Sequence, residues 1–279
     1  GTASPSGSAN YLLGQRFEGQ HLQHLLFGTS DAKSLTIQFW VRSSKTGTYC
    51  FQARSLDDVK SCVVEYTISS ADTWEKKTIT LSGNTANDFD NDNLVSLEFC
   101  WHLSVGTDDD NETASSSWGV GSNSFVTTAN QVNLFDSATA EWYITGIQVE
   151  VGTTATDFEH LPNDVQLTRC QRYFYKNTNN PDGATATAMG MAYSTSAMQE
   201  AYFAFPCEMR TTPTCTFSGL RLYNSSLGNI NNGTYSVLSA SNYNAQIQAA
   251  STSTTLTQHR TYSFKFTGTS DFISADAEL

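Results

Sequence analysis

The chain has 279 residues, of which 15% are charged, and its formal net charge is −12 at pH 7. This acidic balance argues against binding to nucleic acid or to an anionic membrane surface, because both depend on clustered Lys and Arg. The sequence contains no apolar run of about 18 residues, so it predicts no insertion into a membrane. A chain of this length can bury one large core or two ordinary ones.

Apolar and polar side chains alternate through much of the first half, which is the pattern of half-buried strands. The pattern is carried by residues 35–42, 62–68, 95–103 and 144–151. Gly146 interrupts it in the last of these segments and predicts a bulge. Turn-rich connectors separate the segments, and no helical period intervenes. We therefore expect residues 1–158 to form an antiparallel jelly-roll sandwich of the all-β class.

Six cysteines are too few to hold a chain of this size by disulfides, and no Cys or His cluster has the spacing of a zinc site. Cys50 and Cys62 flank a predicted hairpin, so they either face each other across it or stay buried as free thiols. We expect free thiols, which fit a protein that assembles in a reducing cytoplasm better than a secreted one.

Metal binding has little support in the sequence. His21 and His24 are three residues apart, but no third ligand accompanies them. The acidic segments 88–93 and 107–112 lack the spacing of an EF-hand loop. The sequence therefore predicts no metal site and no cofactor, and a structural calcium ion stays as an alternative.

Residues 159–176 break the β pattern. After a Pro, Asn163 or Asp164 can cap a helix, which we expect over residues 164–170, with a strand over residues 173–176. A helix of about two turns is not stable alone in water. The sequence therefore predicts a short helical joint that packs against a neighbouring domain or a neighbouring chain.

The rest of the chain, residues 177–279, predicts a second, smaller β-sandwich. The expected strands are residues 185–193, 199–206, 214–217, 235–238, 258–267 and 272–279. Between them, residues 222–258 carry no Asp, Glu, Lys or Arg and combine Tyr with many Asn, Ser, Thr and Gln side chains. Uncharged side chains of these kinds are typical of recognition loops and suit polyhydroxylated ligands. The alternatives are a polar tip without a ligand and a contact between subunits.

The five tryptophans divide into two groups. Trp40, Trp74, Trp101 and Trp142 lie in or beside expected strands, so we expect most of them to pack in the core or along strand edges. Trp118 lies in the polar segment SSSWGVGS, which we expect to be a loop. There its ring either stacks on a sugar or anchors the loop over the sandwich.

Several ordered segments resemble tail-fibre and related structural proteins of tailed bacteriophages. They are RFEGQHLQHLLFGTSDAKSLTIQFWVRSSKTGTY, YTISSADTWEKKTITLSGNT, YITGIQVEVGTTATDFEHLP, CQRYFYK, FPCEMRTTPTCTFSG and DFISADAEL. The resemblance covers most of the chain and is weakest over residues 220–258. It implies a jelly roll like a carbohydrate-binding module, a trimeric C-terminal tip domain, and further sequence before Gly1.

The resemblance and the residues together predict a non-enzymatic fibre or spike protein of the virion that binds a host-surface glycan. The expected partners are two further copies of the chain, other virion tail or capsid proteins, and the glycan. The residues expected at the trimer joint are Cys170, Arg172, Tyr173, Phe174 and Tyr175. The residues expected to bind glycan are Tyr223, Asn224, Tyr235, Tyr243, Asn244 and Trp118.

Two other functions remain open. The first is a purely structural decoration of the capsid, neck or tail, without a receptor. The second is an enzyme that degrades envelope polysaccharide, because paired carboxylates need only meet in space. The sequence has no GxSxG, no HExxH and no glycine-rich phosphate loop, and we therefore expect no enzyme.

Overall fold

The chain is built almost wholly from antiparallel strands, as predicted. The computed structural model describes residues 5–109, 112–120, 125–178, 186–195, 197–226, 228–230, 234–250, 256–266, 268 and 270–279. The chain divides into two compact units, one of residues 1–160 with residue 279 and one of residues 161–278. Among the described residues, no helix has the length and apolar character needed to cross a bilayer.

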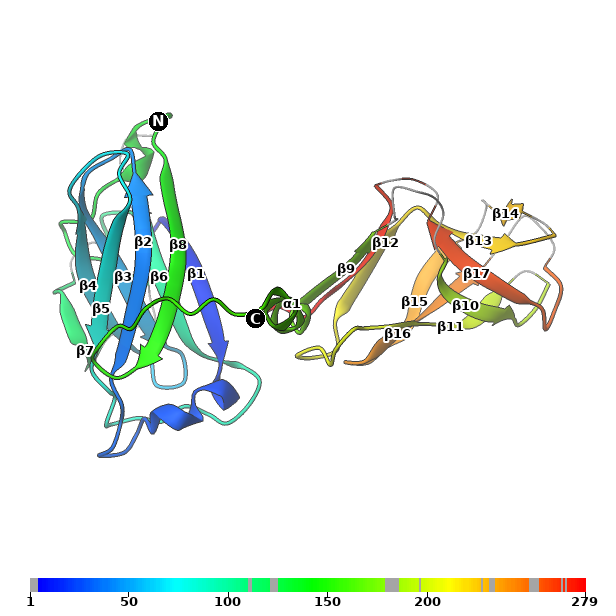
Figure 1. Ribbon diagram of the computed structural model, residues 1–279, viewed down its shortest axis with the longest axis horizontal. Coiled ribbons are helices and arrows are strands. Elements are labelled where there is room, and N and C mark those ends of the chain that lie inside the picture. Colours follow the sequence, from blue (N-terminus) through cyan, green and yellow to red (C-terminus); the bar gives the residue numbers. More distant parts are fainter. Residues whose placement is uncertain are drawn as a thin grey trace. The chain divides into compact units, whose positions relative to one another are not determined.

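The first unit is a two-sheet sandwich (Figure 1). Its strands are β1 (Asn10–Glu18), β2 (Leu35–Ser43), β3 (Gly47–Ser55), β4 (Lys60–Ile68), β5 (Glu75–Leu81), β6 (Val95–Val105), β7 (Ser115–Val120) and β8 (Trp142–Val151). One sheet has the order β1-β6-β3-β4-β7 and the other the order β5-β2-β8. The strands that alternation predicted in this half are confirmed as β2, β4, β6 and β8.

Aromatic rings from both sheets form the core of this sandwich. Phe39 of β2 is fully buried, and its ring meets Tyr66 of β4 at 5.3 Å and Trp101 of β6 at 5.8 Å, both edge-on. Edge-to-face pairs of this kind add to the free energy gained by burying the rings. Cys50 and Cys62 do not face each other, because Cys62 lies opposite Ala53. Both cysteines are buried free thiols, as expected.

The outer side of the five-stranded sheet is covered by residues 125–133. Gln52 of β3 accepts a hydrogen bond from the backbone N–H of Val126 at 3.3 Å, and the ring of Phe125 lies 4.0 Å below the guanidinium of Arg54. Burial lowers the pKa of the nearby His102 to about 3, so this imidazole is neutral at physiological pH. The middle of this outer face, around Gln52, Arg54 and His102, is therefore buried.

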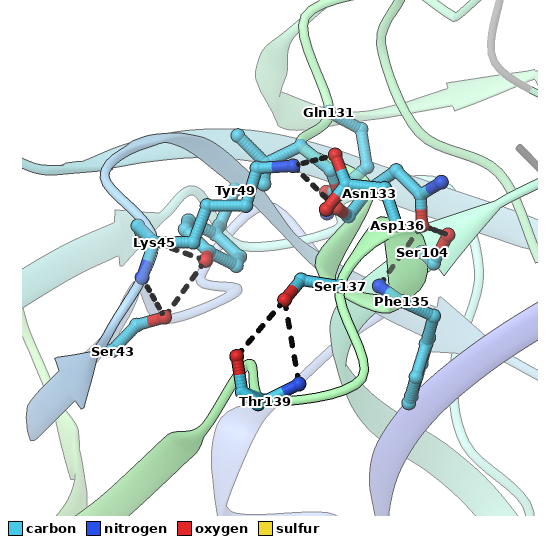
Figure 2. A network of polar contacts seen from close by, with 11 residues as sticks. Ser43, Lys45, Tyr49, Ser104, Gln131, Asn133, Phe135, Asp136, Ser137 and Thr139 are labelled. Atoms are coloured by element: carbon cyan, nitrogen blue, oxygen red, sulfur yellow. Dashed lines mark hydrogen bonds and ion pairs between the residues drawn. The ribbon is translucent and has the colours of Figure 1, made fainter. Parts of the chain in front are cut away.

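A polar network ties the chain before β8 to the sandwich, and Figure 2 shows its members. Lys45 donates to the carbonyl of Asn133 at 2.7 Å and pairs with Asp136. The Asn133 side chain accepts from the Ser104 hydroxyl at 2.7 Å and from the Phe135 N–H at 3.0 Å. These bonds fix the start of the short helical turn Leu134–Asp136 and thereby the direction in which β8 enters its sheet.

Replacing Asn133 with Ala should lower the free energy of unfolding of the first unit by about 1–2 kcal/mol. The change removes the side-chain oxygen that accepts hydrogen bonds from the Phe135 N–H and from the Ser104 hydroxyl. All five tryptophans belong to this unit, so their fluorescence reports its unfolding in denaturant. The exposed Ser137 is a control, and Ser137→Ala should leave the midpoint nearly unchanged. Equal midpoints for all three proteins would refute this role of Asn133.

The second unit is a second sandwich with one helix at its start. Its elements are α1 (Asn163–Gln171), β9 (Phe174–Thr178), β10 (Ala186–Ala192), β11 (Met198–Ala204), β12 (Thr214–Ser218), β13 (Leu220–Asn224), β14 (Gly228–Ile230), β15 (Thr234–Ala240), β16 (Asn244–Ala250), β17 (Thr261–Phe266) and β18 (Phe272–Asp276). The sheets have the orders β14-β13-β17-β10-β11-β16-β15 and β12-β18-β9. Their inner faces share one core, in which Tyr175 of β9 stacks on Phe203 of β11 at 5.8 Å.

The predicted helix and the strand after it are confirmed as α1 and β9, and both belong to the second unit. The prediction for the helix start was wrong. Neither Asn163 nor Asp164 caps the helix, because Pro162 occupies the N-cap position and its carbonyl accepts from the N–H of Gln166 at 3.1 Å. Within residues 222–258, the strand predicted over residues 235–238 is confirmed as part of β15, and the region also contributes β14 and β16, which were not predicted. Residues 227, 231–233 and 251–255 lie outside the described parts of it.

Candidate functional site

Three exposed aromatic rings gather on the outer side of the three-stranded sheet of the first unit. Trp40 lies on β2, Tyr143 on β8, and Trp74 directly precedes β5, so each adjacent strand supplies one ring. Their exposed fractions are 42%, 44% and 42%. We call Trp40, Trp74 and Tyr143 the aromatic platform. Large rings exposed together in this way are a candidate binding surface.

Strand geometry explains why Trp40 points outward. Its neighbours Phe39 and Val41 are fully buried, and alternate side chains of a strand point to opposite faces. On the adjacent strand, Gly146 has a φ of +59°, at the predicted bulge. A Cβ atom at Gly146 would lie 3.2 Å from Cδ1 of Trp40. Glycine at this position therefore leaves room for the Trp40 ring beside the backbone of β8.

The turn that carries Trp74 is held by its own hydrogen bonds. The carboxylate of Glu75 accepts from the N–H groups of Ser69 and Ser70, both at 2.8 Å. Asp72, with a φ of +55°, donates its N–H to the carbonyl of Ser43 at the end of β2, also at 2.8 Å. The ring thus projects from a braced turn, which lowers the entropy lost when a ligand binds.

Charged groups form a polar rim around the platform. Arg42 of β2 is paired with Tyr143 on the adjacent strand β8. Its guanidinium lies 5.6 Å from the centre of the Tyr143 ring and 3.5 Å from a carboxylate oxygen of Asp72. The Tyr143 hydroxyl donates to Glu141 at 2.9 Å, and this bond raises the pKa of Tyr143. The rings of Trp74 and Tyr143 are 6.4 Å apart. Hydrogen-bond donors and acceptors therefore stand beside apolar ring faces.

The chain after β8 covers the other half of the same outer face. The side chain of Gln38 donates to the carbonyl of Thr156 at 2.7 Å, and that of Gln148 accepts from the N–H of Glu159 at 2.7 Å. Figure 1 shows this stretch crossing in front of β8 and β2. Of the described residues on this face, those around the platform are the ones that this stretch leaves open.

This arrangement suits a sugar chain. The C–H face of a pyranose ring can cover an aromatic ring, while its hydroxyl groups turn toward donors and acceptors at the rim. The carboxylates of Asp72 and Glu141 are each held by a neighbour, Arg42 and Tyr143. Their carboxylate oxygens can also accept hydrogen bonds from the hydroxyl groups of a sugar.

The structure places Trp118 in strand β7 and not in the expected loop. Its indole N–H donates to the carbonyl of Ser82 at 2.9 Å, and its ring meets Phe27 edge-on at 5.7 Å. Of the two alternatives for this residue, the anchor that packs over the sandwich agrees with these contacts.

Two of the predicted glycan residues on the second unit have internal partners. The hydroxyl of Tyr235 accepts from the N–H of Leu222 at 3.3 Å and donates to the carbonyl of Ile230 at 3.2 Å, so it joins β15 to β13 and β14. Asn224 is buried and donates to the carbonyl of Thr261 at 3.2 Å. Both side chains hold strands together.

The remaining predicted glycan residues do not form one site. Tyr223 is on β13, with the ammonium of Lys265 3.6 Å from its ring centre. Tyr243 is exposed in the turn before β16, and Asn244 begins that strand. Strands β17, β10 and β11 lie between β13 and β16 in the sheet. The set therefore splits into separate groups, in which Tyr223 is partly buried beside Lys265 and Tyr243 is exposed on its own.

The joint residues lie at the start of the second unit. Helix α1 buries none of its residues, and Cys170 on it is exposed. Phe174 on β9 is also exposed, whereas Tyr175 next to it packs into the core. The carbonyls of Arg172 and Tyr173 accept backbone hydrogen bonds at 2.8 Å, which tie the turn after α1 to the rest of the unit. The five predicted joint residues thus share one segment, but only some of them are available to another chain.

Within the parts of the chain that the structure describes, no three His, Cys, Asp or Glu side chains come together as metal ligands. In the acidic segment 88–93, a side chain bonds to nearby backbone: the carboxylate of Asp92 accepts a hydrogen bond from the N–H of Leu94 at 2.9 Å. Part of the second acidic segment, residues 110–111, lies outside the described residues.

The sequence interpretation missed the platform. It grouped Trp40 and Trp74 with Trp101 and Trp142 as packing residues. This grouping is right for Trp101, with 1% of its surface exposed, and for the half-buried Trp142. Trp40 and Trp74 are exposed instead. The signal that could have identified Trp40 is its place between two inward-facing apolar residues. The same signal applies to Tyr143, which lies between Trp142 and Ile144, because both of these pack against the core. Trp74 has no comparable signal in the sequence.

No protein-family model matches the chain, and no curated protein matches it. Two solved structures show weak similarity, both of discoidin II from Dictyostelium discoideum. The recombinant protein has a TM-score of 0.22 and 9% identity over 90% of this chain and 76% of its own. The wild-type protein has a TM-score of 0.23 and 8% identity over 99% of this chain and 100% of its own. Similarity at this level carries no argument about the present chain.

Proposed function

We propose that this chain is a non-enzymatic, glycan-binding subunit of a bacteriophage fibre or spike, and that the aromatic platform is its binding surface. The observation that carries the proposal is the aromatic platform itself. Its three rings are each more than 40% exposed on one outer face of the three-stranded sheet, and the ion pair of Arg42 and Asp72 lies beside them. The resemblance of the ordered sequence segments to tail-fibre proteins supports the virion setting.

The character of the platform favours a glycan over other ligands. A nucleic acid needs an excess of basic groups, and Arg42 is instead paired with Asp72. An interface with another protein usually has a continuous apolar centre, whereas the rings of the platform alternate with ion pairs and hydroxyl groups. A sugar can pack its C–H groups on the aromatic rings and form hydrogen bonds with the charged groups and hydroxyl groups beside them. Weak contacts of this type gain strength when several copies bind together.

We further propose that the chain acts as a homotrimer, assembled in the host cytoplasm and carried in the virion with other tail or capsid proteins. Helix α1 supports this, because it buries no residue of its own and exposes Val165 and Leu167. A short helix gains stability mainly from packing. A neighbouring copy would supply that packing, with Phe174 beside it.

Immunogold electron microscopy of virions that carry this chain tests the virion role. Antibody raised against the purified full chain should label fibre or spike ends. Label confined to the capsid surface or neck would instead support the decoration alternative, and absence of label from intact virions would contradict both. Release of reducing sugar ends from host polysaccharide by the purified chain would support the enzyme alternative.

A further inference from the structure

The net charge of the chain is confined to one of its two units. The first unit contains 20 Asp and Glu against 8 Lys and Arg, whereas the second contains 7 against 7. The whole net charge of −12 therefore belongs to the first unit, and the second is neutral. Like net charges oppose association between copies of a protein, and a neutral unit removes this barrier.

The outer side of the large sheet in the second unit exposes apolar side chains on three strands. Met189 of β10, Tyr202 of β11 and Leu238 of β15 have exposed fractions of 67%, 56% and 47%. The described outward side chains of these strands and of β16 include Met189, Met191, Tyr202, Ala204, Ser236, Leu238, Gln246 and Gln248. None of these eight is charged, and we call them the neutral face.

The polar members of the neutral face already bond to one another or to a neighbour. The amide of Gln248 donates to the hydroxyl of Ser236 at 3.0 Å, and Gln246 accepts from the hydroxyl of Ser239 at 3.1 Å. Burial of these groups against an apolar surface therefore costs less than burial of groups that bond only to water. The face ends at β17, where Lys265 lies over Tyr223.

We propose that the neutral face is a contact surface between copies of this chain. A strongly charged partner would find no group to pair with among these eight side chains. Met189, Met191 and Leu238 offer a sugar only alkyl and thioether groups, which are at best weak hydrogen-bond acceptors. A second copy presents the same uncharged apolar side chains, which are complementary to themselves in a symmetric contact. The neutral total charge of the unit lets two copies approach without repulsion between these units. This inference adds a contact surface that differs from the proposed joint at α1 and β9, and it needs neither a glycan nor a virion.

Sedimentation equilibrium of the full chain tests this proposal. The wild-type chain should associate as its concentration rises, and Tyr202→Lys or Met189→Lys should weaken association by at least about tenfold, because each places a charge inside an uncharged contact. Both side chains point into solvent, so thermal unfolding followed by circular dichroism should stay as in the wild type. Leu94→Lys is the matched control, since Leu94 is 61% exposed on the first unit. It should leave association unchanged.

A wild-type chain that stays monomeric over the whole concentration range would overturn the proposal. So would variants of the neutral face that associate as tightly as the wild type. A parallel Phe174→Ser variant separates this proposal from the proposed joint. If that variant alone dissociates, copies meet at α1 and β9, and the neutral face has no part in it.

Discussion

Replacing either Trp40 or Trp74 with Ala should weaken the proposed glycan binding by about tenfold to a hundredfold, because truncating an aromatic anchor at a binding surface costs roughly 2 kcal/mol. Both rings project from positions that the backbone fixes, Trp40 by the alternation of β2 and Trp74 by the braced turn before β5. The loss should therefore come from the missing ring rather than from altered folding. Titration of the full chain on a microarray of bacterial surface glycans measures it.

Tyr11→Ala is the matched control for these variants. Tyr11 is an exposed aromatic residue on β1, in the other sheet of the same unit, where its ring contacts Phe135 at 4.9 Å. The control should bind every glycan that the wild type binds, with the same affinity. A platform variant that also kept full affinity would show that the glycan binds elsewhere, and Tyr223 and Tyr243 would then become the next candidates.

Replacing Arg54 with Met should lower the free energy of unfolding of the first unit by about 3–5 kcal/mol, because it leaves a buried carboxylate without its main partner. Glu98 is almost fully buried, with one oxygen 2.6 Å from Nη1 of Arg54 and the other 2.9 Å from Nε of Arg16. Arg16 is half exposed and can replace only part of this interaction. Denaturant unfolding followed by tryptophan fluorescence reports the change.

The double variant Arg54→Met with Glu98→Leu tests the physical reason for that loss. It removes both buried charges, so it should recover most of the stability that the single variant loses. If the double variant is as unstable as Arg54→Met, the loss comes from the missing packing of the Arg54 side chain against Phe125. The charge argument would then be wrong.

Much of the fold follows from local patterns in the sequence. Strict alternation predicted β2, β4, β6 and β8 because each is buried on one face by the partner sheet. The bulge at Gly146 and helix α1 were also predictable, because both depend on a few adjacent residues. Strand β16 escaped prediction, since its inward Ala245, Ile247 and Ala249 are small or isolated among polar residues.

The site could not be predicted because it depends on which outward faces other segments cover. Both Trp40 and Gln52 lie on the outer side of a sheet, yet Gln52 is sealed under residues 125–133 and Trp40 is open. The coverage is decided by chain segments distant in sequence, such as the stretch that binds Gln38. In the same way, Tyr235 is a polar aromatic residue in a polar region, but its hydroxyl joins three strands.

The most direct test is a binding titration of the full chain against envelope polysaccharide isolated from the bacterium that the proposed bacteriophage would infect. We predict saturable binding by the wild type, loss of binding by the double variant Trp40→Ala with Trp74→Ala, and unchanged binding by Tyr223→Ala with Tyr243→Ala. Absence of saturable binding by the wild type, or equal binding by the platform double variant, would contradict the account.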